Sequence, residues 1–202
     1  MLAQLLIENP HELKKNRSQF IDVNYACALG FVLSGDIPNF NLHLENIELE
    51  DITGRYLINK RIERLLHLYL TATIALETDK YQERIEQIWN SNNENFSRLF
   101  FERNAELYSI ILTQNEKYKL ANRINNELQN MKAKERDLEI YKRSLLRSLY
   151  LHSIRGNFDL FENKLNSIKR KKEIWTKEET SFLKKIKFEN TQELYKPALK
   201  VF

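Results

Sequence analysis

The 202-residue chain is poor in glycine, proline and cysteine. It has 4 glycines and 3 prolines, whereas an all-β fold needs such turn residues about every 10 positions. Their scarcity therefore favours long helices joined by short turns. The single cysteine, Cys27, excludes an intrachain disulfide and cannot build a thiolate metal site alone. Because Cys27 lies in an apolar run, we expect it to pack in the core.

Long apolar runs are missing as well. No stretch of about 20 apolar residues occurs, so we expect no membrane-spanning helix and no membrane partner. The first residues lack the basic region that opens a secretory signal peptide. Together with the single cysteine, this predicts a cytoplasmic protein, because thiols stay reduced in the cytoplasm.

Catalytic signatures are also missing. The sequence contains none of the motifs of zinc proteases, dinucleotide-binding folds, P-loops or α/β-hydrolases. Its 4 histidines are scattered and form no ligand pair at helical spacing. We therefore expect a protein that is not an enzyme, with no cofactor and no metal site.

Charge, by contrast, is abundant. Hydrophobic residues make up 42% of the chain and charged residues 30%, a balance typical of a globular protein rather than a disordered one. The net charge of +4 permits contact with nucleic acid without requiring it. We expect most charged side chains to lie on solvated helix faces.

A sequence pattern recurs along the chain: a segment with helical apolar periodicity is followed by a short polar turn and then by a second amphipathic segment. The turns fall at residues 34–37, 78–81, 115–118 and 155–158, and their last residues lie 44, 37 and 40 positions apart. A period near 40 predicts stacked antiparallel helical hairpins. We expect an all-α protein with a single domain over residues 1–202. Four hairpins should span about residues 17–170, and a C-terminal capping helix and tail should span about residues 176–202. A single irregular helical bundle has the same sequence signature and stays the alternative.

The first and last hairpins match most closely. One offset of 121 residues aligns Gly35 with Gly156 and carries the apolar stripe of one second helix onto the other. The stripe pairs are Phe40 with Phe161, Leu44 with Leu165, and Ile47 with Ile168. Gly35 is placed to end its helix in a left-handed cap.

These turns resemble those of tetratricopeptide-type repeats, in a degenerate form. In that family a small residue of the first helix is followed by a Gly-Asp/Asn-aromatic turn. The matching residues are Ala28, Gly35-Asp36-Ile37 and Leu44; Ala72 and Tyr81; Tyr118 and Ala121; and Gly156-Asn157-Phe158 and Leu165. The departures are an uneven spacing and large residues, Phe40, Arg84 and Phe161, where the family has a small one.

The resemblance implies an α-solenoid whose first helices line a concave groove. Positions counted back from each turn place the groove residues at Tyr25, Tyr69, Thr73, Arg103, Glu106, Gln114, Arg143 and Tyr150. Such a groove suits an extended peptide, whose backbone groups need polar partners. The alternative is that Tyr25, Tyr69 and Tyr150 are ordinary core aromatics. Because similar regions occur in bacterial and phage regulators, the resemblance also implies a regulatory role.

The C-terminal region offers a second hypothesis. Basic residues gather there around the aromatics Trp175 and Phe182, a combination that can contact phosphates and stack on bases. The candidate nucleic-acid contacts are Lys169, Arg170, Lys171, Lys172, Lys184 and Lys185. The alternative is that these basic residues lie at helix C-termini, which lysine and arginine favour, and that Phe182 is a core residue.

The sequence thus predicts a non-enzymatic helical-repeat interaction module that binds a protein or peptide partner. A nucleic-acid-binding protein that uses the basic C-terminal segment is the alternative. The sequence makes no prediction of oligomeric state.

Overall fold

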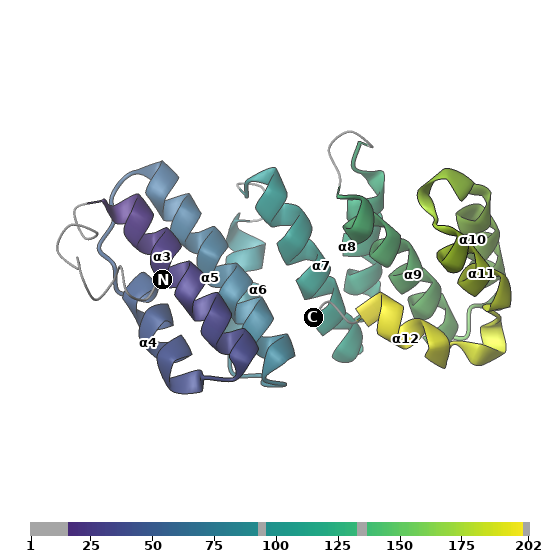
Figure 1. The fold of residues 1–202 in the computed structure, drawn as a ribbon, viewed down its shortest axis with the longest axis horizontal. Coiled ribbons are helices and arrows are strands. Elements are labelled where there is room, and N and C mark those ends of the chain that lie inside the picture. Colours follow the sequence, from purple (N-terminus) through teal and green to yellow (C-terminus); the bar gives the residue numbers. More distant parts are fainter. Residues whose placement is uncertain (1–15, 93–95, 133–136, 200–202) are drawn as a thin grey trace. The chain divides into compact units, whose positions relative to one another are not determined.

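The computed structural model describes residues 16–92, 96–132 and 137–199, and every regular element within them is helical (Figure 1). Within these residues, ten α-helices pack as adjacent hairpins, which confirms the all-α prediction. They are α3 (Arg17–Ser34), α4 (Ile37–Glu48), α5 (Arg55–Ala75), α6 (Gln82–Asn92), α7 (Arg98–Gln114), α8 (Tyr118–Asn130), α9 (Leu138–Ile154), α10 (Phe158–Arg170), α11 (Lys177–Lys185) and α12 (Gln192–Leu199). The short 3-10 helices η3 (Lys172–Ile174) and η4 (Phe188–Asn190) flank α11. Among these helices, none has both the length and the apolar character needed to cross a membrane.

The chain divides into two compact units, and the boundary falls within α7. Unit 1 comprises residues 1–104, and unit 2 comprises residues 105–202. Unit 1 therefore holds α3 to α6 and the beginning of α7. Unit 2 holds the rest of α7 and α8 to α12.

Three of the four predicted turns contain one residue in the left-handed conformation, and at the second turn this residue directly precedes the predicted range. These residues are Gly35, Glu77, Glu116 and Gly156, with φ of 77°, 49°, 58° and 67°. At three of the turns, this residue's N–H donates to the carbonyl three residues back and the next N–H donates to the carbonyl five residues back. Successive left-handed residues lie 42, 39 and 40 positions apart, which is more even than the spacing of 44, 37 and 40 between the last residues of the predicted turns. The left-handed residue is therefore the better marker of the repeat.

The left-handed conformation of Glu116 and Gly156 leads to a prediction about the stability of the fold. We expect Glu116→Gly to raise the free energy of unfolding by about 0.5–1 kcal/mol, because glycine lacks the Cβ clash of this conformation. Gly156→Ala should lower it by about 1 kcal/mol. An added Cβ at Gly156 would meet no atom within 4 Å, so the cost is purely conformational. Urea unfolding followed by circular dichroism measures both effects.

The matched control is Glu116→Ala. It removes the same carboxylate but keeps the Cβ in the left-handed region, so we expect it to give no comparable gain. If alanine stabilised as much as glycine, the benefit would come from losing the charge rather than from relieving the backbone.

The predicted stripes of the first and last hairpins are confirmed as core. Phe40, Leu44 and Ile47 of α4 are buried, as are Phe161, Leu165 and Ile168 of α10. The residues that close the turns behave differently. Ile37 and Phe158 are about half exposed, whereas Tyr81 is buried with its ring stacked on Tyr69. Tyr81 has another role because its turn is two residues longer, so it follows Glu77 by four positions instead of two.

In unit 1, the first helices α3 and α5 pack with equivalent positions facing each other. Three hydrogen-bonded pairs join them, Ser18 with Lys60, Asp22 with Arg64, and Tyr25 with His67, and the members of each pair are 42 residues apart. This separation equals the distance from Gly35 to Glu77. The predicted core position of Cys27 is confirmed, since it is buried beside Phe20 and Val23.

In unit 2, α9 is the central helix and packs against α8, α10 and α12. The predicted capping box is present: Thr176 accepts from the N–H of Glu179, and the Glu179 carboxylate accepts from the N–H of Thr176. It begins α11, which packs on α10. The tail then turns back, and α12 lies across α9 (Figure 1). Leu194, Ala198 and Leu199 of α12 are buried there.

Candidate binding site

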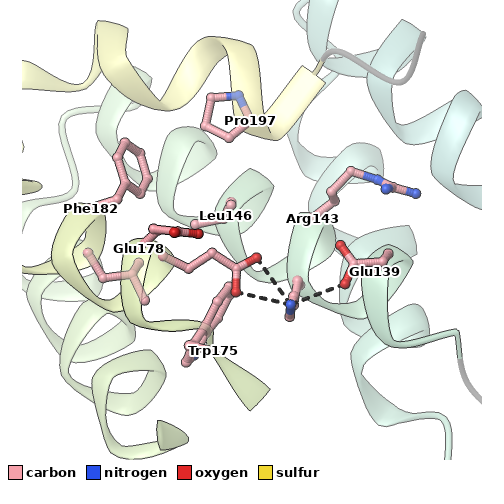
Figure 2. Close-up of a pocket in the computed structure, with 10 residues that line it drawn as sticks. Glu139, Arg143, Leu146, Trp175, Glu178, Phe182 and Pro197 are labelled. Carbon is pink, nitrogen blue, oxygen red and sulfur yellow. Dashed lines mark hydrogen bonds and ion pairs between the residues drawn. The ribbon is translucent and has the colours of Figure 1, made fainter. Parts of the chain in front are cut away.

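An open pocket of about 540 Å³ lies among α9, α11 and α12 in unit 2 (Figure 2). Its walls are mainly apolar, and charged side chains stand around them. The apolar residues are Leu146, Trp175, Phe182, Leu183 and Pro197, and the charged residues are Glu139, Lys142, Arg143, Glu178 and Glu179. We call this the unit 2 pocket. An apolar cavity with a few polar groups is the usual form of a ligand site.

Local hydrogen bonds fix the aromatic wall of the pocket. The indole N–H of Trp175 donates to the carbonyl of Ile168 at 3.2 Å, near the end of α10. The capping box begins immediately after Trp175, so the start of α11 is set by the same short segment. One turn into α11, Phe182 stands beside the buried Leu183. Trp175 is thus positioned by backbone bonding and not only by packing.

Lys142 organises the charges of the pocket. Its ammonium group donates to Glu139 at 3.1 Å and to Glu179 at 3.0 Å, and lies 5.8 Å from the centroid of the Trp175 ring. Burial would lower the pKa of Lys142, but the hydrogen bonds to Glu179 and Glu139 outweigh it, and the pKa is raised. Glu178 is exposed and has no ion pair among the described residues. The pocket therefore presents one carboxylate that no described residue neutralises.

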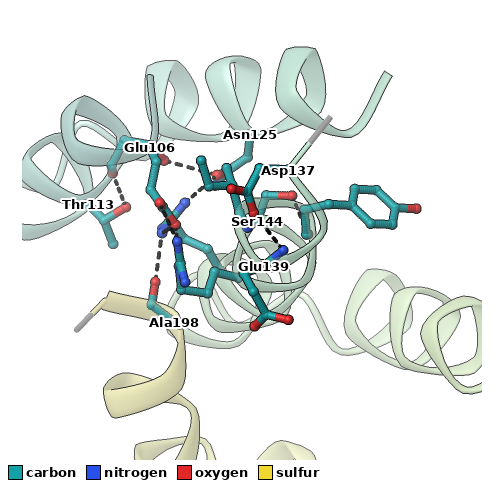
Figure 3. A network of polar contacts seen from close by, with 12 residues as sticks. Glu106, Thr113, Asn125, Asp137, Glu139, Ser144 and Ala198 are labelled. Carbon is teal, nitrogen blue, oxygen red and sulfur yellow. Dashed lines mark hydrogen bonds and ion pairs between the residues drawn. The ribbon is translucent and has the colours of Figure 1, made fainter. Parts of the chain in front are cut away.

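A buried polar network lies beside the pocket (Figure 3). Glu106 of α7 accepts two hydrogen bonds from Arg143, at 2.7 and 2.8 Å, and one from Arg147 at 3.2 Å. Arg147 is 0% exposed and also donates to Asn125 of α8 and to the carbonyl of Ala198 of α12. Burial lowers the pKa of Arg147, and the Glu106 carboxylate opposes that shift. The network ties four helices of unit 2 together.

Two of the predicted groove residues, Glu106 and Arg143, therefore meet as a bidentate ion pair. The sequence missed Arg147 and Asn125. A signal for Arg147 did exist, since a second arginine four residues after Arg143 interrupts an apolar helix. Tyr150 lies with its ring 5.9 Å from that of Tyr195 in α12, and Gln114 is exposed at the end of α7. Of these predicted residues only Arg143 borders the unit 2 pocket.

In unit 1, the predicted groove residues separate into two places. Tyr25 lies beside Arg64, whose guanidinium carbon is 4.7 Å from the centroid of its ring. Tyr69 instead faces the second helices: its hydroxyl donates to Glu48 of α4, and burial together with that bond raises its pKa. The hydroxyl of Thr73 donates back to the carbonyl of Tyr69 at 2.8 Å. Arg103 is exposed on α7.

The basic residues of the C-terminal region lie at or next to helix C-termini, as the alternative to a nucleic-acid site predicted. Lys169 and Arg170 form the last turn of α10, and Lys184 and Lys185 the last turn of α11. Lys171 and Lys172 follow α10 directly, and the Lys171 ammonium lies 5.7 Å from the centroid of the Tyr141 ring. The two aromatics expected to stack on bases, Trp175 and Phe182, belong to the unit 2 pocket.

Comparison of the chain with protein-family models, with curated proteins and with solved structures finds no significant match. The described residues also contain no cluster of three or more side chains that could hold a metal ion. The unit 2 pocket is therefore interpreted from its own geometry.

Proposed function

We propose that this chain is a non-enzymatic helical-repeat module, similar to tetratricopeptide-type arrays, that binds a protein or peptide partner. We place the contact in the unit 2 pocket, where an apolar side chain of the partner inserts. The observation that carries the proposal is an open 540 Å³ pocket whose apolar walls include a positioned tryptophan. Aromatic residues at the centre of an apolar pocket supply most of the binding energy in many interfaces.

The charges of the pocket specify the partner further. Lys142 is paired with Glu139 and Glu179, and Arg143 is paired with Glu106. Glu178 at the rim has no ion pair with any residue that the structure describes. A peptide with an aromatic or aliphatic anchor and a nearby lysine or arginine complements this arrangement.

Tryptophan fluorescence provides the test. The chain has 2 tryptophans, so in a Trp89→Phe background Trp175 reports the pocket alone. Peptides of about 12 residues are selected from a random display library on the protein and then titrated. We expect the selected peptides to contain an apolar anchor, to shift the emission of Trp175, and to bind Phe182→Ala at least tenfold more weakly. Phe158→Ala is the control, because Phe158 is an exposed aromatic outside the pocket. Equal affinity for Phe182→Ala and the parent would refute this location.

Nucleic-acid binding by the C-terminal region is the second candidate. It is supported by the exposure of Arg170, Lys172, Lys184 and Lys185, for which the described structure records no ion pair. If phosphate contacts dominate, affinity for a single-stranded oligonucleotide falls steeply with salt. A gel shift unaffected by replacing these four residues with glutamine would remove this candidate.

A further inference from the structure

An arginine recurs at one position of the repeat. Counted back from the left-handed residue, position 13 holds Asp22 in the first hairpin and then Arg64, Arg103 and Arg143. Two of these arginines are bound by a carboxylate of the chain. Arg64 donates to Asp22 at 3.1 Å, and Arg143 donates to Glu106 through two bonds. Arg103 has neither a hydrogen bond nor an ion pair within the part of the chain that the structure describes.

The reason lies in the residue that would pair with it. Arg143 is bound by Glu106, which stands ten residues before the left-handed residue of the preceding hairpin. In the hairpin that precedes Arg103, this position holds His67. Burial, together with the charges of Arg103 and Arg64, lowers the pKa of His67 to about 4, so the imidazole is neutral at pH 7. A neutral imidazole stands where a carboxylate would be needed.

The acids around Arg103 already have partners. Asp22 is bound by both Lys60 and Arg64. On α7 itself, Glu102 pairs with Arg98, and Glu106 is bound by two other arginines. Glu63 accepts from the N–H and the hydroxyl of Ser97, directly before α7. None of the described acidic residues near Arg103 is therefore left to neutralise its positive charge.

The surroundings of Arg103 form an ordered surface. Phe100 stands one turn earlier on α7, so the two side chains share a face of the helix. The Arg64 guanidinium carbon lies 4.0 Å from the centroid of the Phe100 ring and 4.7 Å from that of Tyr25. Alongside is a pocket of about 400 Å³ whose apolar side is formed by Tyr56, Phe96, Leu99 and Phe100 and whose polar side is formed by Asn59, Lys60, Glu63, Arg64 and Ser97. A guanidinium that is unpaired among the described residues thus stands next to an aromatic cluster and a hollow with one apolar side.

We propose that Arg103, supported by Arg64, Tyr25 and Phe100, binds a carboxylate of an acidic peptide, and that the adjoining hollow receives a neighbouring apolar side chain. The planar guanidinium fork matches a carboxylate through two parallel hydrogen bonds. The inference rests on the proposed function in taking the ligand to be a peptide, but it concerns unit 1 and involves none of the residues of the unit 2 pocket.

The test uses defined peptides and the NMR signals of the guanidinium groups of the isotope-labelled 202-residue chain. The probe is acetyl-Leu-Glu-Leu-Glu-amide, and its glutamine counterpart is the matched peptide. We expect the glutamate peptide to shift the Arg103 Nε–H and Phe100 ring resonances to saturation in the millimolar range. The glutamine peptide should bind at least tenfold more weakly than the glutamate peptide. Arg103→Gln should reduce binding of the glutamate peptide at least tenfold, whereas Arg103→Lys should retain part of it, because a lysine keeps the charge but loses the bidentate fork.

The controls separate the alternatives. Arg123→Gln removes an exposed arginine elsewhere on the chain and should leave binding unchanged. Phe182→Ala should also leave it unchanged, so failure of the unit 2 pocket and failure of this site give different results. Equal binding by Arg103→Gln and the parent protein, or equal effects of the two peptides, would overturn the inference. Saturable shifts with inorganic phosphate or a single-stranded oligonucleotide, but none with the glutamate peptide, would overturn the assignment to a peptide.

Discussion

Replacing Glu106 with glutamine should destabilise unit 2 by about 3–5 kcal/mol, because the change removes the counter-charge of a fully buried arginine. Arg147 has no exposed surface, and Glu106 is the carboxylate that accepts from it. The same substitution breaks the bidentate pair with Arg143. The remaining acceptors of Arg147, the oxygens of Asn125 and Ala198, are neutral and cannot replace that charge. Urea unfolding of a Trp89→Phe background, followed by Trp175 fluorescence, measures the loss.

Glu127→Gln is the matched control. Glu127 also pairs with an arginine, Arg123, but that side chain is 77% exposed, and its distance of 3.3 Å is that of an ordinary surface pair. Such pairs contribute about 0–1 kcal/mol. A Glu106→Gln protein that lost no more stability than the control would show that Arg147 tolerates burial with neutral partners alone.

Phe161→Ala should cost about 3–5 kcal/mol, whereas Phe158→Ala should cost less than about 1 kcal/mol. The two residues lie one turn apart on α10, yet Phe161 is 0% exposed and Phe158 is 52% exposed. Truncating the buried ring leaves a cavity, whereas the half-exposed Phe158 ring loses less packing, including its edge contact with Phe188. The same fluorescence measurement distinguishes them. Equal losses would mean that the residue closing the turn contributes as much to the core as the buried stripe of α10.

Helices and turns could be predicted because their determinants are local. Apolar spacing, the glycines at positions 35 and 156, and the capping box at Thr176 act within a few residues of themselves. The left-handed Glu77 and Glu116 could not be predicted, because glutamate has no preference for that conformation. The sequence therefore aligns the repeats on the last residue of each predicted turn instead.

That alignment explains which groove positions shifted. The second turn is two residues longer than the first, so counting back from Tyr81 selects Tyr69, whereas counting back from Glu77 selects His67 as the equivalent of Tyr25. Tyr25 and His67 are the pair that meets across α3 and α5, at 3.1 Å. The two-residue difference turns a helical side chain by about 200°, toward the opposite face.

The unit 2 pocket could not be predicted for a different reason. Trp175, Phe182 and Pro197 come from three segments, and they meet only because the tail after η4 turns back onto α9. No local pattern encodes that return. The sequence left base stacking as one interpretation of Trp175 and Phe182 and core packing as the alternative for Phe182, whereas in the structure both line the pocket.

The register between α3 and α5 constrains how such a chain can lengthen. Its three hydrogen-bonded pairs join residues separated by the full 42-residue repeat. Duplication of a whole hairpin would copy the residues of these pairs at the same spacing and preserve the register. A deletion of one residue within α5 would instead rotate the following part of the helix by about 100° and break every later pair. Within a duplicated hairpin, replacing a single glutamate with histidine would then remove the internal ion pair of an arginine. That arginine would become available to bind an outside ligand.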